Sequence, residues 1–280
     1  MERLPALAYS VVVAIGVAGA VVWFQRPVLR ETAPLAVPAA APPAAAPEPA
    51  PAPGPMVKYP IEALTDTPGP PPPPLDQADR YVQQALFGLI GRAAVLSSLR
   101  PESFVRRAVT TVDNLGRRRA PSAMWPVRQT PGHFAVLSRS EGIVVNPDNS
   151  LRYSPFVSLV VSVDTARAVV LYARLYPLFQ RAYEELGYPG QYFNDRLVSV
   201  IDELLQTPER SGPLRVELTE VKGAMKSLQP WTRYRFSDPQ LESLSAGQKM
   251  LLRAGPANER RLKAKLADIR RRLTGAALAQ

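Results

Sequence analysis

The sequence predicts a mainly α-helical globular domain with a few short strands, placed behind an N-terminal transmembrane helix and a proline-rich spacer. Three observations support this class: an uncharged apolar run near the N-terminus, an Ala/Pro-rich stretch after it, and apolar residues at helical spacing in the remainder. The 280-residue chain therefore divides into an anchor and its flank (1–30), a spacer (31–74), a folded domain (75–274) and a C-terminal tail (275–280).

The anchor is predicted from residues 4–25, which carry no charged side chain. At about 1.5 Å per residue they reach roughly 33 Å, enough for a hydrocarbon core of about 30 Å. Trp23 and then Arg26 end the run as an interfacial aromatic and a flanking charge. The alternative is a signal peptide cleaved near Ala20, but the apolar run continues through Phe24. We expect an uncleaved, single-pass anchor.

The spacer, rich in alanine and proline from residue 33 to 74, is expected to be disordered and extended rather than folded. Proline fixes φ and lacks an N–H donor, which favours polyproline II and holds the domain away from the membrane. A ligand for a proline-recognition module is the alternative, yet no charged residue flanks a clear P-x-x-P. Residues 56–67 interrupt the prolines with Tyr59, Ile61 and Leu64, and are interpreted as a short docking segment.

The first half of the domain should contain three helical segments and a hairpin. Asp76 is expected to cap a helix that ends near Ile90, and a second helix should run from Pro101 to Gly116. A loop follows over 116–132, and then two β-rich runs at 134–137 and 143–145. A third helical stripe comprises Phe156, Leu159, Val160 and Val163.

The second half begins with the strongest helical pattern. Asp164 should cap a helix whose apolar face ends at Leu186, with a kink or break at Pro177. A turn at 187–190 leads to a helix from about Phe193 to Leu204. The remaining expected elements are strands at 214–218 and 233–236, a helix at 245–253 capped by Ser245 with Gln248, and a helix from Pro256 with Leu262, Leu266, Ile269 and Leu273 inward.

Two long segments resemble the bacterial domain-of-unknown-function family 3014. They are the run from Tyr176 to Val198, YPLFQRAYEELGYPGQYFNDRLV, and the run from Asp238 to Lys249, DPQLESLSAGQK, with GPAN at 255–258 just after. The similarity extends over about residues 75–273, and the arrangement of a span followed by a proline-rich spacer is also typical of the family. The resemblance implies an envelope location, with the anchor in the bacterial inner membrane and the domain in the periplasm, rather than any activity.

Composition restricts the possible chemistry. The absence of cysteine excludes disulfides, thiolate metal sites and a cysteine nucleophile. His133 is the only histidine, and with no nucleophile beside it we interpret it as a loop residue. We predict no catalytic residue, metal ligand or cofactor. The 34 basic and 24 acidic residues give a net charge of +10, which favours anionic partners but is equally typical of a solvated arginine-rich surface.

The tract from Tyr188 to Arg196 is the first candidate binding surface. Its side chains could hold a sugar or peptide, or could simply cap a helix, form an ion pair and fill the core edge. The residues concerned are Tyr188, Tyr192, Asn194, Asp195 and Arg196. The structural interpretation is favoured. Carboxylates from Glu184 to Glu203 also suggest an alternative, an envelope-polymer hydrolase, if two of them face each other across a cleft.

The second candidate surface is the basic face of the last helix, represented by Arg261, Lys265 and Arg272. Its arginines could contact an anionic lipid or polymer, or could be solvated only. Nucleic acid is not expected, because no binding motif is present. The leading hypothesis is a non-enzymatic, membrane-tethered envelope protein whose periplasmic helical domain binds another envelope protein, a cell-wall polymer or anionic lipid.

The topology can be tested with reporters fused after Gln280. Positive charges flank the apolar run almost equally, Arg3 on one side and Arg26 and Arg30 on the other, so charge alone does not set the orientation. An outward-facing domain should give alkaline phosphatase activity and no signal from a fluorescent protein that matures only in the cytoplasm. Fluorescence without phosphatase activity would reverse the orientation.

Overall fold

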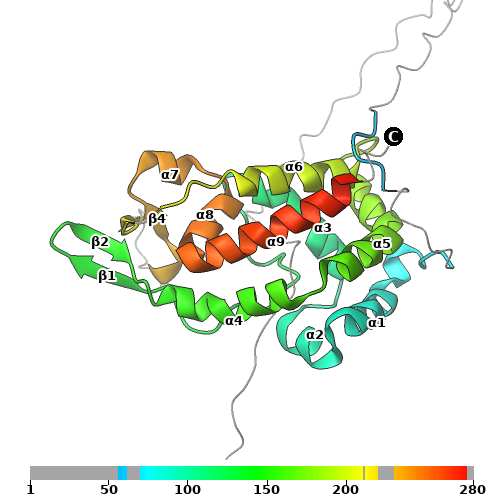
Figure 1. Cartoon of the computed structure of the whole chain (residues 1–280), viewed down its shortest axis with the longest axis horizontal. Coiled ribbons are helices and arrows are strands. Elements are labelled where there is room, and N and C mark those ends of the chain that lie inside the picture. Colours follow the sequence, from blue (N-terminus) through cyan, green and yellow to red (C-terminus); the bar gives the residue numbers. More distant parts are fainter. Residues whose placement is uncertain (1–55, 62–69, 211, 220–229, 276–280) are drawn as a thin grey trace, which may run out of the picture.

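The computed structural model describes residues 56–61, 70–210, 212–219 and 230–275. The expected membrane anchor lies outside them. Within them the chain is mainly helical, as expected, with two short antiparallel strand pairs (Figure 1). In chain order the elements are η2 (Leu75–Gln77), α1 (Asp79–Ile90), α2 (Arg92–Ser98), α3 (Phe104–Leu115), β1 (Val136–Arg139), β2 (Gly142–Val145), α4 (Asn149–Ser162), α5 (Thr165–Glu185), α6 (Phe193–Leu205), β3 (Val216–Leu218), η3 (Pro230–Thr232), β4 (Tyr234–Phe236), α7 (Pro239–Ser243), α8 (Ala246–Ala254) and α9 (Pro256–Gly275).

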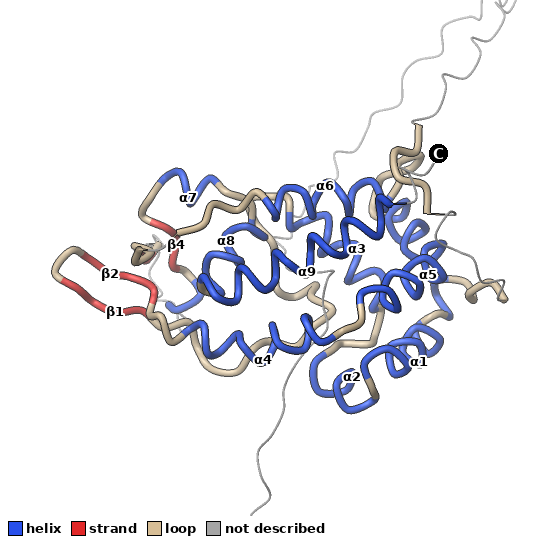
Figure 2. Tube along the Cα trace, viewed as in Figure 1, coloured by secondary structure: helices blue, strands red, loops and turns tan. Residues whose placement is uncertain are grey.

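Helix α9 runs through the middle of the described fold and packs against α4, α5, α6 and α8 (Figures 1 and 2). Helix α3 packs on α5 and α6. The apolar faces of these helices form one large core, as their 3.6-residue spacing predicts. Its most deeply buried large side chains include Val82, Leu99, Val109, Val112, Phe193, Ile201 and Leu273.

Aromatic side chains join α5 to α6 at one end of this core. The Phe179 and Phe193 rings stack with centroids 5.7 Å apart, and Tyr172 lies 5.3 Å from Phe179. Such offset and tilted pairs add to the free energy of burying the rings. The predicted apolar face of α5 is therefore confirmed, except at its last residue, Leu186. Leu186 follows the end of α5 and is 39% exposed, because the chain turns away there toward Gly187.

A smaller core lies beneath the strands. β1 pairs with β2 and β3 with β4, both antiparallel, as predicted, and the Val145 amide donates to Leu214 O to connect the two pairs. The Arg253 guanidinium lies between the rings of Phe134 and Phe236, 5.7 and 5.1 Å from their centroids. This buried cation–π contact fastens the strands to α8.

Several element boundaries differ from the sequence expectation. Asp76 lies in η2, and α1 begins at Asp79 without a side-chain cap, so the predicted cap at Asp76 is wrong. Helix α2 was not predicted; Gly91, with φ 86°, separates it from α1. Helix α3 begins at Phe104, after Ser103 in the left-handed region. Each of these starts depends on a backbone turn that apolar spacing does not reveal.

The two internal prolines do not end their helices. Helix α4 begins at Asn149, well before the predicted stripe, and contains Pro155. Helix α5 continues past Pro177 to Glu185, with buried side chains on both sides of the proline. We attribute this continuity to that packing, which offsets the missing backbone hydrogen bond. In the described part of the chain no single helix is long and apolar enough to span a membrane, and α4 and α5 meet that test only as a pair bent by 78°.

The predicted caps at the N-termini of α5 and α8 are confirmed. Asp164 accepts a hydrogen bond from the Arg167 amide at 2.8 Å, and Ser245 with Gln248 forms a capping box. The segment GPAN is a helix stop and restart, as expected: Gly255 has φ 88°, and Asn258 Nδ2 donates to Ser150 O at 2.8 Å and to Ala254 O at 3.0 Å. These hydrogen bonds connect α4, α8 and α9 at one joint.

Two helical glycines should respond in opposite ways to substitution by alanine, because Gly247 lies where α8 packs on α6 and Gly88 of α1 has open space beside it. A Cβ added at Gly247 would overlap the Leu204 side chain and lie 3.1 Å from Leu115 Cδ2, whereas one at Gly88 meets nothing within 4 Å. We expect Gly247→Ala to lower the free energy of unfolding by about 1–3 kcal/mol. Gly88→Ala should raise it by about 0.5–1 kcal/mol, because alanine reduces the entropy lost on helix formation. Urea denaturation measures both, and equal effects would contradict this packing.

Candidate functional site

Residues Met56–Ile61, hereafter the strap, are docked on the first turn of α6. Asp195 accepts hydrogen bonds from the backbone amides of Lys58 and Tyr59, at 3.0 and 2.8 Å. Asn194 Nδ2 donates to the carbonyl of Tyr59 at 2.9 Å. Ile61 enters the main core and is only 4% exposed. The docking expected in this region is therefore confirmed for residues 56–61, within the range assigned to the spacer.

The docking also corrects the structural role predicted for Asn194 and Asp195. Neither side chain caps α6, which begins after Tyr192 without a side-chain cap. The first α6 amide, that of Phe193, instead donates to Gln180 Oε1 on α5 at 2.9 Å. Asn194 and Asp195 are thereby available to bind the strap, more than 130 residues away in sequence.

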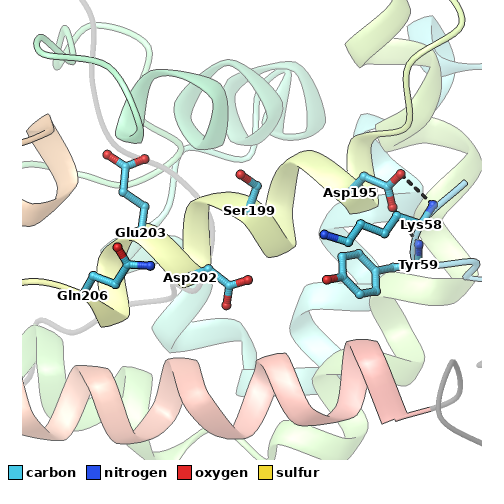
Figure 3. A pocket seen from close by; sticks show the side chains of 7 residues that line it. All are labelled: Lys58, Tyr59, Asp195, Ser199, Asp202, Glu203 and Gln206. Atoms are coloured by element: carbon cyan, nitrogen blue, oxygen red, sulfur yellow. Dashed lines mark hydrogen bonds between the residues drawn. The ribbon is translucent and has the colours of Figure 1, made fainter. Parts of the chain in front are cut away.

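A polar groove of about 360 Å³ lies beside the strap along α6 (Figure 3). Asp195 and Asp202, seven residues apart on α6, both line it. Asp202 makes an ion pair with Arg270 of α9 through both carboxylate oxygens, so it is already neutralised. The lining residues are Lys58, Tyr59, Asp195, Ser199, Asp202, Glu203 and Gln206.

The carboxylates considered for hydrolysis do not oppose each other across this groove. Asp195, Asp202 and Glu203 all come from α6, and Figure 3 shows Glu203 directed to the other side of that helix from Asp202. A glycosidase needs an acid and a second carboxylate on opposite sides of the bond to be broken. This groove does not have that arrangement.

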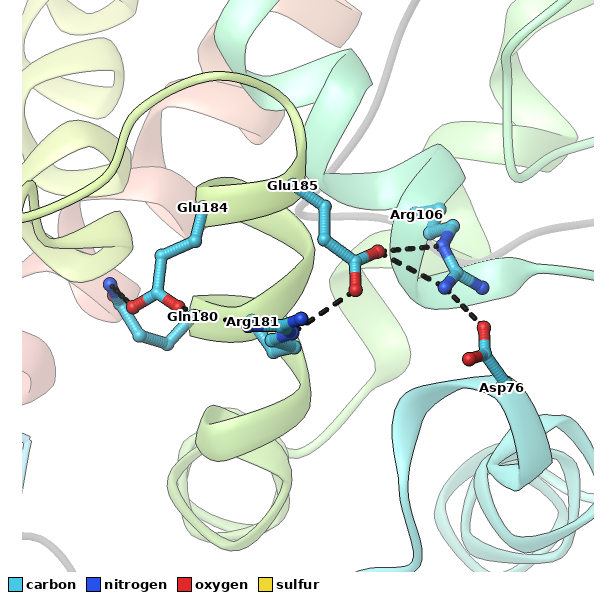
Figure 4. Close-up of polar contacts among 6 residues, drawn as sticks. All are labelled: Asp76, Arg106, Gln180, Arg181, Glu184 and Glu185. Carbon is cyan, nitrogen blue, oxygen red and sulfur yellow. Dashed lines mark hydrogen bonds and ion pairs between the residues drawn. The ribbon is translucent and has the colours of Figure 1, made fainter.

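Glu184 and Glu185 take part in polar contacts that connect helices (Figure 4). Gln180 Nε2 donates to Glu184 at 3.0 Å, and Arg181 Nε bonds Glu185 at 3.1 Å within α5. Arg106 of α3 reaches Glu185 at 3.1 Å and Asp76 of η2 at 2.5 Å. These residues therefore join η2, α3 and α5.

Tyr188 and Arg196 converge on Asp113 near the end of α3, a residue that the sequence pattern did not single out. Asp113 is 4% exposed; it accepts from Arg196 Nε at 3.1 Å and pairs with Arg117 at 2.6 Å. The Tyr188 hydroxyl donates to it at 3.2 Å, and its ring stacks on Tyr183 at 4.5 Å. Burial first, and then the Asp113 charge, raises the pKa of Tyr183 to about 12. The predicted acid partner of Arg196 is thus Asp113.

The five side chains of the tract consequently do not form one patch. Tyr188 and Arg196 face α3, while Asn194 and Asp195 face the strap. Tyr192 is half-buried before α6, and its carbonyl accepts from the Arg196 amide at 3.2 Å. Most of the tract therefore holds neighbouring elements in place, in agreement with the structural interpretation.

The basic residues of α9 also have different environments. Lys265 is half-buried, and its ammonium donates to Val163 O and, at 2.9 Å, to Thr165 Oγ1, which closes the junction between α4 and α5. Burial lowers its pKa. The prediction that Lys265 is a free surface charge is therefore wrong.

Four arginines of α9 remain exposed, and we call them the arginine face: Arg260, Arg261, Arg271 and Arg272. Arg261 donates to Ser158 Oγ at 3.1 Å, and Arg271 and Arg272 lie 2.9 and 3.6 Å from Asp268. At 100° per residue, the four side chains fall within about a third of the helix circumference. The arginine face thus presents several cations on one rigid helix.

His133 lies in the loop before β1, as predicted, and is exposed. Its ring contacts that of Trp231 in η3, with centroids 4.0 Å apart, which gives Trp231 a packing role. Among the described residues no three acidic or histidine side chains are grouped so that they could hold a metal ion.

The chain belongs to the family described as "Protein of unknown function (DUF3014)", whose sequence model matches residues 104–270, more than half of the chain. The resemblance inferred from the two motifs is therefore confirmed. No curated protein and no solved structure gives a significant match. Within the matched region, the motif residues analysed above cap helices, form ion pairs or pack in the core.

The separation of roles on α9 predicts that two cations will respond differently to neutralisation. Lys265→Met should lower the free energy of unfolding by about 1–3 kcal/mol, because it leaves the Val163 carbonyl without this donor. Arg261→Met should leave the urea midpoint nearly unchanged, since Arg261 is exposed. A similar midpoint shift in both variants would contradict the assigned role of Lys265.

Proposed function

We propose that the protein is a non-enzymatic, single-pass inner-membrane protein whose helical domain stands in the periplasm and binds an anionic envelope polymer. The membrane and envelope parts rest on the apolar run at residues 4–25, the Ala/Pro-rich spacer and the family resemblance. The polymer part rests on one structural observation, the arginine face of α9.

The arginine face suits a polymer that carries repeated negative charges. Arg260 and Arg261 lie near one end of α9, and Arg271 and Arg272 near the other. Eleven residues at about 1.5 Å each separate the two pairs by roughly 16 Å along the helix axis. Guanidinium groups bind carboxylates and phosphates through paired hydrogen bonds, so two such pairs could bind successive anionic groups of one chain.

The tether favours a polymer over the membrane surface. Because the strap holds the chain on the domain from Met56 onward, the free spacer would comprise residues 31–55. Twenty-five residues of polyproline II at about 3.1 Å each reach up to roughly 80 Å. A spacer extended to this limit would allow the domain to stand beyond the headgroups of its own membrane and within the surrounding envelope.

The hydrolase alternative gains no support from the geometry. Glu184, Glu185 and Asp202 make the bonds described above, and Asp195 holds the strap. Glu203 lies on another side of α6 and has no carboxylate opposite it among the groove residues (Figure 3).

The proposal predicts that charge position, and not only net charge, governs binding. We expect reversal of all four residues of the arginine face to glutamate to weaken cosedimentation with purified wall polymer at least tenfold. Binding by the native chain should fall as salt is raised, because exposed charges are screened within about 8 Å at 0.15 M. The melting temperature should change little, since exposed charges contribute weakly to folding.

A matched control reverses four other exposed arginines, Arg80, Arg118, Arg119 and Arg128, and changes the net charge equally. This variant should keep most of the binding. An equal loss in both variants would contradict a localised site. Binding to anionic vesicles but not to wall polymer would instead identify a lipid surface as the partner.

A further inference from the structure

The strap is held in a way that depends on its backbone. Three hydrogen bonds connect Asn194 and Asp195 to the amides of Lys58 and Tyr59 and to the carbonyl of Tyr59. None of the three uses a strap side chain. Successive N–H groups of an extended strand point to opposite sides, so one carboxylate that accepts two of them holds a bent backbone, and Lys58 and Tyr59 lie in such a bend. Asp195 and Asn194 together therefore recognise the backbone of a bent peptide segment.

The side chains that hold the strap are positioned by the rest of the fold. Asn194 is fully buried, and the Tyr172 hydroxyl of α5 donates to its Oδ1 at 3.3 Å, which leaves its Nδ2 to face the strap. Asp195 follows it on α6, between Phe193 and Leu197, which are both buried in the core. The binding groups are therefore preorganised by contacts that do not involve the strap.

Two strap side chains contact the core, Ile61 fully and Tyr59 in part. Ile61 is 4% exposed, whereas Met56 is 93% and Val57 39% exposed. Lys58 is exposed, and its ammonium lies 5.2 Å from the centre of the Tyr59 ring. The requirements for an occupant are thus two successive free amides, an aromatic side chain on the second of these residues, and an aliphatic side chain two residues later.

We infer that the surface formed by Asn194, Asp195 and the apolar site of Ile61 is a binding site for a peptide segment that is bent at its two bound amides. The strap is the occupant that this chain supplies itself. Because strap and site belong to one chain, a high effective concentration keeps the site filled. A free peptide of the same sequence binds the same site once the chain's own strap is displaced.

The test uses the full-length chain in detergent micelles with Tyr59→Pro and Ile61→Asp, which remove one amide donor and the buried aliphatic group. The probe is a capped, fluorescein-labelled hexapeptide of the sequence Met-Val-Lys-Tyr-Pro-Ile. Fluorescence anisotropy should show at least tenfold tighter binding to this variant than to the native chain, in which the strap competes.

Two changes identify the site. Adding Asp195→Ala to the variant should weaken peptide binding at least tenfold, and N-methylation of the peptide's tyrosine amide should do the same. Ser199→Ala is the matched control, because this exposed α6 residue lines the groove without bonding the strap, and it should leave binding unchanged. If the folded variant binds no better than the native chain, or if binding is insensitive to Asp195→Ala, the inference is wrong.

If the strap variant does not fold, amide hydrogen exchange on the native chain tests whether the strap can leave its site while the domain stays folded. Opening of the strap alone should let the Tyr59 amide exchange at least tenfold faster than the amide of Val198, which lies in the core. Equal protection of the two amides would show that the strap opens only with the whole domain, and would overturn the inference.

Discussion

Four consecutive residues at the start of α6 hold together parts of the chain that are far apart in sequence. Successive residues of a helix point about 100° apart, so residues 193–196 face four directions. The Phe193 ring stacks with Phe179 of α5, and Asn194 and Asp195 bind the strap. Arg196 pairs with Asp113 of α3. A shift of this turn would disturb α3, α5 and the strap together.

The remaining motif residues act in a similar way. Gln180 bonds the α6 amide of Phe193, Gly247 allows α8 to approach α6, and Asn258 connects α4 to α9. These residues either form hydrogen bonds with backbone N–H and C=O groups or allow helices to pack closely. Inside a core, unpaired backbone groups and packing gaps both lower the stability of the fold. The long segments shared with the family therefore specify how the helices are joined, and the function is expected to depend on surfaces that they support.

The basic side chains have two roles that composition cannot separate: some join elements of the fold, and others are exposed on its surface. Arg106, Arg196 and Arg270 make ion pairs between elements, and Lys265 closes a helix junction. The arginine face is exposed and has only Asp268 as an acidic partner within ion-pair distance among the described residues. Arginines in ion pairs cancel against their acids in the net charge of +10, so this total does not show where positive charge is exposed, and the position of the exposed arginines is more informative.

Interactions within a few residues made much of the fold predictable from the sequence. The apolar face of α5, the caps Asp164 and Ser245, and the hairpin of β1 and β2 followed from spacing and local hydrogen bonding. Long-range contacts were not predictable. Asp195 binds amides at positions 58 and 59, Arg196 finds Asp113, and Lys265 bonds Thr165 about 100 residues away. No local pattern encodes such partners, because their approach depends on the packing of whole helices. In the packed structure most of the tract from Tyr188 to Arg196 contacts other elements of the fold, whereas four arginines of α9 remain exposed.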